Sequence, residues 1–265
     1  VLTTTPHYNI IESELKKYPL KKFLFGLYYK SEFKGIKVYH IPQKKFKKTI
    51  YRIISFIYWH VVSFIFSLFF KNLNFIISPS PPLSIGLISL MVAKIKGAKS
   101  IYNVQEIYPD LMINQGKLKS KLFIKILKKL EKLIYNNSDA VITIDKVFYS
   151  KIYPRIINNN KLHIISNFVD TELYNSSVLS SEIPECFKQS NNKLKIIYAG
   201  NIGIFQDWIP LIYASKKLIN ENIEFWIIGE GSKKSFLENL VIKNSLKNIK
   251  VFPYQNRKLM PLYFL

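Results

Sequence analysis

The amino-acid sequence predicts an α/β protein with parallel sheets, arranged as two domains. Short apolar runs alternate along the chain with stretches of helical periodicity, which is the pattern of repeated βαβ units. Two such series occur, one before and one after a polar stretch at 171–193 that contains proline and several serines. The boundaries predict a domain at 1–170, a linker at 171–193 and a second domain at 194–265. The two halves are similar in kind, as two Rossmann-like domains are.

The elements of the first series follow from their composition and from the residues that end them. The opening residues 1–9 have the pattern of a strand that enters a loop. A proline-rich stretch ends the apolar run at 74–82, and Gly97 lies near the end of the helix that follows this run. Strands are expected at 74–82, at the start of 100–110, at 140–144 and at 161–170, and helices at 82–100 and 117–139.

The second series repeats this alternation after the linker. Each apolar, β-rich run is followed by a turn and then by a segment with helical spacing, except the last run. Strands are expected at 194–199, 223–229 and 248–254, and helices at 207–221 and 232–246.

Net charge narrows the classes of partner. The chain has 39 Lys and Arg against 17 Asp and Glu, a formal charge of +22, which favours a polyanion: nucleic acid, an anionic membrane surface or a phosphate-bearing substrate. Nucleic acid ranks last because no aromatic–basic RNA motif and no recognition helix is evident. Cys186 is the only cysteine, which excludes disulfides and cysteine metal sites and fits a reducing compartment.

Two segments favour an anionic membrane surface as a partner. Residues 50–70 are apolar and long enough to span a bilayer, at about 20 residues. Lysines flank this segment, while Arg52 and His60 interrupt it, so we expect a buried or membrane-lying helix rather than a span. In 117–134, leucines and isoleucine at helical spacing alternate with lysines: Leu118, Leu122, Ile126, Leu130 and Leu133. This segment fits either a helix on the sheet with a solvated lysine face or a helix that docks on anionic lipid.

Glycine turns follow two strands of the second series. Gly200 and Gly203 follow the first strand, and Gly229 and Gly231 follow the next. Each turn alone fits a tight architectural turn as well as it fits a phosphate-binding turn, because neither has the G-x-G-x-x-G spacing of dinucleotide-binding loops. Two neighbouring strands that both end this way predict a phosphate cradle at the carboxyl edge of one sheet.

Residues after the second turn add to this prediction. Ser232 is expected to cap the following helix. Lys233 and Lys234 lie in its first turn, where the helix dipole favours anions. A bound anion would compensate for these two charges, although solvated lysines are also tolerated.

Five motifs in order carry a family resemblance over nearly the whole chain. They are "SPSPPLSIG", "YNVQEIYPD", "HIISNFVDTELY", "YAGNIG" with Gln206, and "FWIIGEGSKKSFL". Together they resemble the retaining, GT-B-fold glycosyltransferases of family 4. The subgroup they are most like is that of bacterial surface-polysaccharide enzymes, which includes fucosamine transferases.

The resemblance implies a site for a nucleoside diphosphate sugar in the second domain. The first turn would lie by the diphosphate, the second would line the nucleotide, and the loop after the last strand would lie near the base. The family often has Arg or Lys in the first turn, whereas 200–207 contain neither, so Lys233 and Lys234 would substitute. The implied donor-site residues are Gly200, Asn201, Ile202, Gly203, Gly229, Gly231, Lys233, Lys234, Pro253 and Tyr254.

The resemblance implies an acceptor cleft on the first domain. Glu106 and Asp110 occupy the two acidic positions of the family's motif, with Tyr108 at its aromatic position, and His7 and Tyr8 belong to a loop that lines the cleft. The two acids also fit a helix-capping role, and His7 also fits a surface position. Asn167 and Asp170 match a turn that is structural. No cofactor and no metal is implied, and no metal-spaced cluster is evident.

The implied reaction moves a hexose or amino-hexose onto a polyprenyl-linked oligosaccharide, at the cytoplasmic face of the membrane, in lipopolysaccharide or capsule synthesis. The family's pair of glutamates seven residues apart is expected beyond Leu265, and a strand with a glycine loop is expected before Val1. The chain 1–265 is therefore expected to be an inactive fragment of an active enzyme. Two alternatives stay open: a soluble sugar-nucleotide epimerase of related fold, and a non-enzymatic membrane module in which 50–70 spans the bilayer.

Overall fold

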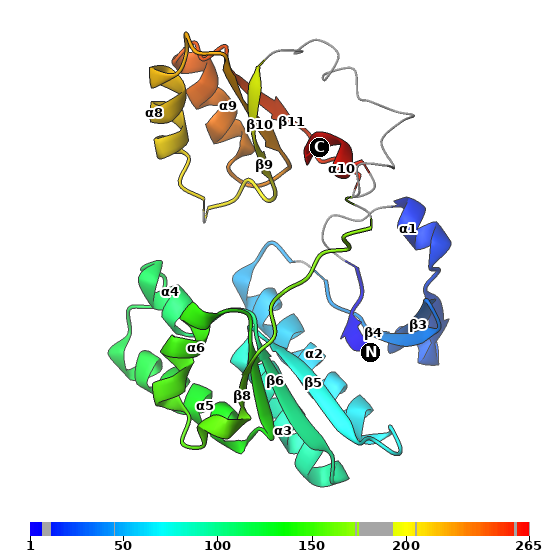
Figure 1. The fold of residues 1–265 in the computed structure, drawn as a ribbon. Coiled ribbons are helices and arrows are strands. Elements are labelled where there is room, and N and C mark those ends of the chain that lie inside the picture. The colour runs from blue at the N-terminus through cyan, green and yellow to red at the C-terminus, as the bar shows by residue number, and fades with distance from the viewer. Residues whose placement is uncertain are drawn as a thin grey trace. The chain divides into compact units, whose positions relative to one another are not determined.

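The computed structural model describes residues 1–6, 12–44, 46–172, 174, 193–204, 206–256 and 259–264. The chain divides into two compact units, Val1–Asn167 and Phe168–Leu265. Figure 1 shows the first unit in blue to green and the second in yellow to red. His7, Tyr8 and nearly all of the predicted linker lie outside the described residues.

Unit 1 contains two four-stranded sheets. One is mixed, with the order β1-β4-β3-β2; β1 is parallel to β4, and β2, β3 and β4 form antiparallel pairs. The other is parallel throughout, with the order β5-β6-β7-β8. The strands are β1 (Leu2–Thr4), β2 (Lys21–Phe23), β3 (Tyr28–Phe33), β4 (Ile36–Ile41), β5 (Phe75–Ser80), β6 (Lys99–Val104), β7 (Ala140–Thr143) and β8 (Leu162–Ile164).

The helices of unit 1 connect these strands. They are α1 (Glu12–Lys17), α2 (Thr49–Leu68), α3 (Leu83–Lys96), α4 (Asp110–Asn114), α5 (Lys121–Asn137) and α6 (Lys146–Ile152), with 3-10 turns at Leu24–Gly26, Tyr153–Arg155 and Asn159–Lys161. α3 links β5 to β6, and α5 leads into β7, so the parallel sheet has the predicted βαβ connections (Figure 1). Ser120 accepts a hydrogen bond from the Phe123 amide and caps α5, so the helix predicted at 117–139 begins four residues later.

The core of unit 1 lies between the parallel sheet and α3 and α5. Tyr102 and Val104 of β6 are fully buried and pack with Ile134 and Tyr135 of α5. Gly86 lets α3 approach the sheet closely, because a Cβ atom there would lie 2.6 Å from the Tyr102 ring. Burial raises the pKa of Tyr102 to about 12.

Helix α2 is mostly exposed, so of the two forms expected for this segment, buried or membrane-lying, the buried form is wrong. Only Ser55, His60 and Ser63 are buried among its residues. The His60 ring is fixed by hydrogen bonds from Nδ1 to the Phe56 carbonyl (2.7 Å) and from Nε2 to Ser84 Oγ (2.9 Å). By length and composition alone α2 could cross a membrane, and 11% of its apolar window is buried.

The hairpin β3–β4 was not predicted from the sequence. Its turn is Lys34–Gly35, and both residues have positive φ, 48° and 79°. Positive φ at both central residues is typical of the two-residue turns that join antiparallel strands, but lysine is not among the residues that usually mark such a turn in a sequence.

Unit 2 contains a parallel three-stranded sheet with the order β11-β10-β9. Its elements are β9 (Leu194–Ala199), α8 (Ile209–Lys217), β10 (Ile223–Ile228), α9 (Lys234–Lys243), β11 (Ile249–Phe252) and α10 (Pro261–Phe264). The central strand β10 is buried on both faces, with Phe225 and Ile227 packed among Trp208, Ile212 and Leu237. Both helices are shorter than predicted: each begins two residues later, and α8 and α9 end four and three residues earlier.

Candidate functional site

The two glycine turns lie side by side at the carboxyl edge of the unit 2 sheet. β9 and β10 pair in parallel as far as Ala199 and Ile228, so their turns start at the same level. The Gly200 amide donates to the Ile228 carbonyl (3.0 Å), and the Ile202 amide donates to the Glu230 carbonyl (2.9 Å). The predicted adjacency of these turns is therefore present.

Close packing between the two turns requires two of the glycines. Gly229 has φ +153°, and a Cβ atom there would lie 1.9 Å from the Gly200 carbonyl oxygen. A Cβ atom at Gly231 would lie 2.2 Å from the Ile202 carbonyl oxygen, which also accepts a hydrogen bond from the Lys233 amide. Backbone contact between the turns thus accounts for both residues, whether or not a ligand binds there.

Side chains hold the first turn in shape. Gln206 Oε1 accepts a hydrogen bond from the Gly203 amide (3.1 Å). The Tyr198 hydroxyl donates to the Asn201 carbonyl (2.9 Å), and burial raises the pKa of Tyr198. These contacts order the turn before any ligand arrives, and the role of Tyr198 was missed in the sequence.

Glu230 is a site residue that sequence reasoning missed. Lys234 Nζ pairs with Glu230 Oε1 at 2.6 Å, and hydrogen bonding to Lys234 lowers the pKa of Glu230. The Tyr254 backbone amide also contacts this carboxylate. The Glu230 carboxylate therefore lies beside the first turn of α9, where an anion was predicted. The sequence feature from which Glu230 could have been predicted is its position between Gly229 and Gly231.

The two lysines differ in their contacts. Lys233 Nζ lies 4.8 Å from the centroid of the Phe236 ring, whereas Lys234 forms the ion pair. Helix α9 begins at Lys234 with Lys233 as its N-cap residue, and no side chain caps it. The prediction that Ser232 caps this helix is wrong.

The loop after β11 reaches the same edge of the sheet. The Gly229 amide donates to the Phe252 carbonyl (3.1 Å), which joins the end of β11 to the second turn. Pro253 and Tyr254 follow directly and are exposed. The predicted donor-site residues of the three loops thus lie at one edge.

In unit 1, Glu106 lies in the loop after β6 and is exposed. Its carbonyl accepts a hydrogen bond from Ser80 Oγ at the end of β5 (2.8 Å). Gln105 joins this edge to Asn167, whose Nδ2 donates to Gln105 Oε1 (3.0 Å). Glu106 is therefore presented at the carboxyl edge of the parallel sheet, where open α/β sheets bind ligands.

Asp110 has a different environment from Glu106. The Arg155 guanidinium bridges Asp110 and Glu131, and its distance to Glu131 is 2.7 Å. Glu131 is 1% exposed, and desolvation raises its pKa although Arg155 opposes the shift. Asp110 thus belongs to a largely buried ion-pair network. Arg155 was missed because it is 45 residues away in the sequence.

Among the residues that the structure describes, no group of three or more His, Cys, Asp or Glu side chains is placed to hold a metal ion. His7, the third residue predicted for the acceptor cleft, lies outside that part.

Comparisons with known proteins agree with this architecture. No protein-family model matches the chain. A protein described as a colanic acid biosynthesis glycosyl transferase, WcaI of Escherichia coli (strain K12), is 26% identical over 177 residues, which are 64% of this chain and 43% of that protein.

Solved structures match with low identity. HepE from Anabaena, in complex with UDP-glucose, has a TM-score of 0.57 at 11% identity and covers 86% of this chain and 58% of its own. Sucrose-phosphate synthase from Thermosynechococcus elongatus has a TM-score of 0.62 at 10% identity and covers 99% of this chain and 62% of its own. The fold is of the GT-B type. The chain spans less than two thirds of each of these three proteins.

Removing Arg155 tests whether the Asp110 network is structural. Arg155→Ala leaves Glu131 buried without its cation, so we expect a loss of about 3 kcal/mol in the free energy of unfolding. The pKa of Glu131 rises further in the variant. A carboxyl group whose pKa is raised by folding stabilises the fold at pH values below its pKa in the unfolded chain. This stabilisation disappears as the pH rises through its pKa in the folded protein. The free energy of unfolding lost in Arg155→Ala should therefore be larger at about pH 8 than at about pH 5. Urea unfolding followed by circular dichroism measures both.

The exposed ion pair Lys99–Asp139 provides the control. Lys99→Ala removes a pair whose side chains are 66% and 40% exposed, so its cost should stay below about 1 kcal/mol. Equal costs for the two substitutions would contradict a structural role for the Arg155 network.

Proposed function

We propose that this chain is part of a retaining glycosyltransferase that takes a hexose or amino-hexose from a nucleoside diphosphate sugar. Unit 2 carries the donor turns, and unit 1 carries the acceptor side. The observation that supports this most is the pair of hydrogen-bonded glycine turns at one sheet edge, in a fold shared with HepE in its complex with UDP-glucose. The proposal includes surface-polysaccharide synthesis as the setting, in keeping with the colanic acid relative.

The turns suit the chemistry of a departing diphosphate. When the bond between the sugar C1 and the phosphate oxygen breaks, negative charge grows on the diphosphate. Fixed amides at a helix N-terminus stabilise such charge without reorganisation. Lys234 adds a cation. When the donor binds, its ammonium group would leave the Glu230 carboxylate and pair with a phosphate oxygen instead. Glu230 thus holds the lysine in place until the donor binds.

On the acceptor side, Glu106 is the residue we propose to contact the acceptor. It is exposed at the carboxyl edge of the parallel sheet, whereas Asp110 is engaged by Arg155. An exposed carboxylate there can accept a hydrogen bond from a sugar hydroxyl. His7 stays a candidate for the same cleft.

A membrane-bound acceptor is supported by one layer of helices in unit 1. Helix α3 contacts both α2 and α5, so the three form one layer against the parallel sheet. We call the exposed surface of these three helices the three-helix face. Its exposed apolar residues include Ile50, Ile53, Ile54, Ile57, Val61 and Ile65 of α2, Met91 and Ile95 of α3, and Leu122, Phe123, Ile126 and Leu133 of α5.

Basic residues accompany this apolar surface. Lys44, Lys47 and Lys48 precede α2, and α5 exposes Lys121, Lys125, Lys128, Lys129 and Lys132. Apolar residues among lysines fit the surface of an anionic bilayer, at about 1 kcal/mol for each cation near it. We therefore propose a peripheral position on the cytoplasmic face of the membrane, with a polyprenyl-linked oligosaccharide as acceptor.

Calorimetric titration of the chain with UDP tests the donor site. Lys234→Met removes the cation that we place on the phosphate, so UDP binding should weaken about tenfold. Lys243→Met, at the other end of α9, serves as the matched control and should bind UDP like the parent chain. Glu230→Gln frees Lys234 and should strengthen binding. Equal dissociation constants in all four proteins would exclude this site for the diphosphate.

Vesicle sedimentation tests the three-helix face. Ile54 and Ile57 are 55% and 54% exposed, so replacing both with Asp should leave the fold intact. The double variant should lose binding to vesicles that contain about 30% phosphatidylglycerol. Ile242→Asp alters an equally apolar position in unit 2, 74% exposed, and should bind normally. Unchanged binding of the double variant, or equal loss with Ile242→Asp, would contradict the proposal.

A further inference from the structure

An exposed apolar turn joins strands β2 and β3 of the mixed sheet in unit 1. Leu24 is 63% exposed and Phe25 is fully exposed, and Phe23 and Leu27 on either side of them are exposed as well. We call these four residues, with Gly26 among them, the hairpin tip. β2 is the outermost strand of its sheet, so the tip lies at an edge of the fold. Large apolar side chains that gather on a surface indicate a contact with a partner.

The backbone of the tip has a conformation that bulky apolar residues seldom adopt. Leu24 and Phe25 have φ of 45° and 53°, and Gly26 has φ of 97°. Positive φ is adopted most readily by Gly, Asn and Asp. The turn is nevertheless closed, because the Leu27 amide donates to the Leu24 carbonyl (3.0 Å). Two apolar side chains thus stand where a purely structural turn would favour Gly or Asn, and such conflicts are typical of functional sites.

Lysines surround the base of the tip. Lys21 and Lys30 are direct partners across the antiparallel pair β2–β3, and like charges in such positions repel each other. Among the described residues, neither of them forms an ion pair with an acidic side chain. From Lys16 to Lys48 the sequence contains eleven lysines and one acid, Glu32. This charge distribution favours a partner that carries closely spaced anions.

The spacing between the lysines and the tip fits the depth of a membrane interface. Lys21 precedes Phe23 by two residues in β2, which corresponds to about 7 Å along the strand. Lys30 Nζ lies 4.4 Å from the centroid of the Phe23 ring, so charge and apolar side chains meet at the base of the tip. Elements that lie in a bilayer interface reach about 5–10 Å into the boundary between headgroups and acyl chains. An inserted tip therefore leaves its lysines at the level of the phosphates.

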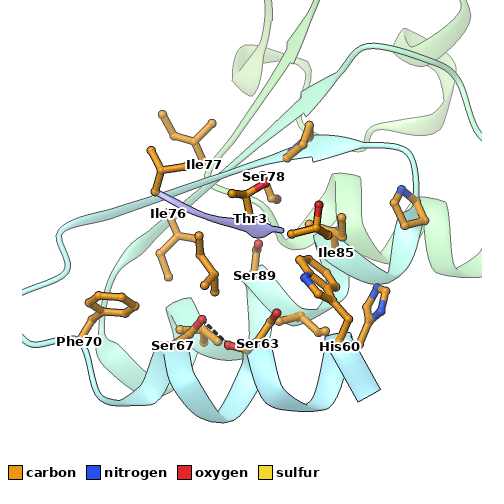
Figure 2. A pocket seen from close by; sticks show the side chains of 18 of the residues that line it. Thr3, His60, Ser63, Ser67, Phe70, Ile76, Ile77, Ser78, Ile85 and Ser89 are labelled. Atoms are coloured by element: carbon orange, nitrogen blue, oxygen red, sulfur yellow. Dashed lines mark hydrogen bonds between the residues drawn. The ribbon is translucent and has the colours of Figure 1, made fainter. Parts of the chain in front are cut away.

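Aromatic contacts attach the tip to helix α2. The Tyr28 ring stacks on Phe23, with centroids 5.4 Å apart, and packs against Phe66 of α2 at 4.8 Å. Figure 2 shows Ser63 on the inner side of α2, where this helix faces α3 and lines a cavity of about 540 Å³. Ile65 lies on the opposite side of the helix and is exposed. The tip is thus held beside a helix whose exposed surface belongs to the three-helix face.

We propose that the hairpin tip inserts into the interface of an anionic bilayer and forms a second membrane contact of unit 1. The inference rests on the membrane position proposed above and adds an element to it. A bilayer presents a plane of phosphates above an apolar layer, in the same order as the lysines and the tip. A helix that lies on a membrane can roll about its axis. A second contact beside the last turns of α2 fixes this rotation.

Asparagine substitution at the tip tests the inference by vesicle sedimentation. Asn tolerates positive φ, so Leu24→Asn with Phe25→Asn should keep the turn and leave the melting temperature no lower than that of the parent chain. Binding of this double variant to vesicles with about 30% phosphatidylglycerol should weaken at least about tenfold. Ile36→Asn is the matched control, because Ile36 is 53% exposed and pairs with the far end of β3. The control variant should bind like the parent chain.

A fluorescent label measures insertion of the tip directly. Cys186 is the only cysteine, so Cys186→Ser with Phe25→Cys gives a chain that takes an NBD label at position 25 alone. Its emission should rise at least about threefold on vesicles with about 30% phosphatidylglycerol and should be quenched by lipids brominated in their acyl chains. The same label attached after Ile36→Cys should keep the emission that it has in water.

Failure of the tip and failure of the earlier proposals give different results. Equal vesicle binding by the double variant and the parent chain, or a label at position 25 that stays in water on bound protein, would overturn the tip and leave the three-helix face standing. A parent chain that binds no anionic vesicles would overturn both membrane contacts. A parent chain that dimerises in solution through the tip, while the double variant stays monomeric, would assign the tip to a second copy instead. UDP binding is independent of all these results.

Discussion

Parallel pairing of strands is the constraint on which the rest of the structure depends. Parallel neighbours cannot be joined by a tight turn, so each strand is followed by a crossover, and all carboxyl ends meet at one edge. In unit 2 this places the turns after β9, β10 and β11 together. In unit 1 it presents Glu106 beside the end of β5.

The glycine turns show how architecture and binding share the same residues. Gly229 and Gly231 are required because the two turns touch through their backbones. That contact also fixes the amides around the N-terminus of α9, which is a site for anions in any helix of this kind. The structure fills this position with its own carboxylate, Glu230, held by Lys234. A ligand phosphate would therefore compete with an internal anion rather than enter a neutral site.

Local signals predicted much of the fold and less of the site. Apolar runs and the glycine near its end located the parallel strands and α3, which ends at Gly97 with a left-handed φ of 66°. Contacts between distant residues could not be predicted, because no local pattern links Arg155 to Asp110. The exposed stripe of α5 was also unpredictable in detail: Leu122 and Ile126 have core-like spacing, yet Ile134 and Tyr135 form the buried side. Periodicity identifies a face of a helix, but the packing partner decides which face is buried.

The most direct test of the central claim is a titration of 15N-labelled chain with UDP, followed by two-dimensional NMR. The account predicts that amide shifts concentrate at Asn201, Gly203, Gly231 and Lys234, in the paired turns of unit 2. Saturation should occur below about 5 mM, since nucleotide sugars are ordinarily bound in or below the millimolar range. Shifts confined to unit 1, or no shifts at that concentration, would contradict the assignment of these turns to a diphosphate.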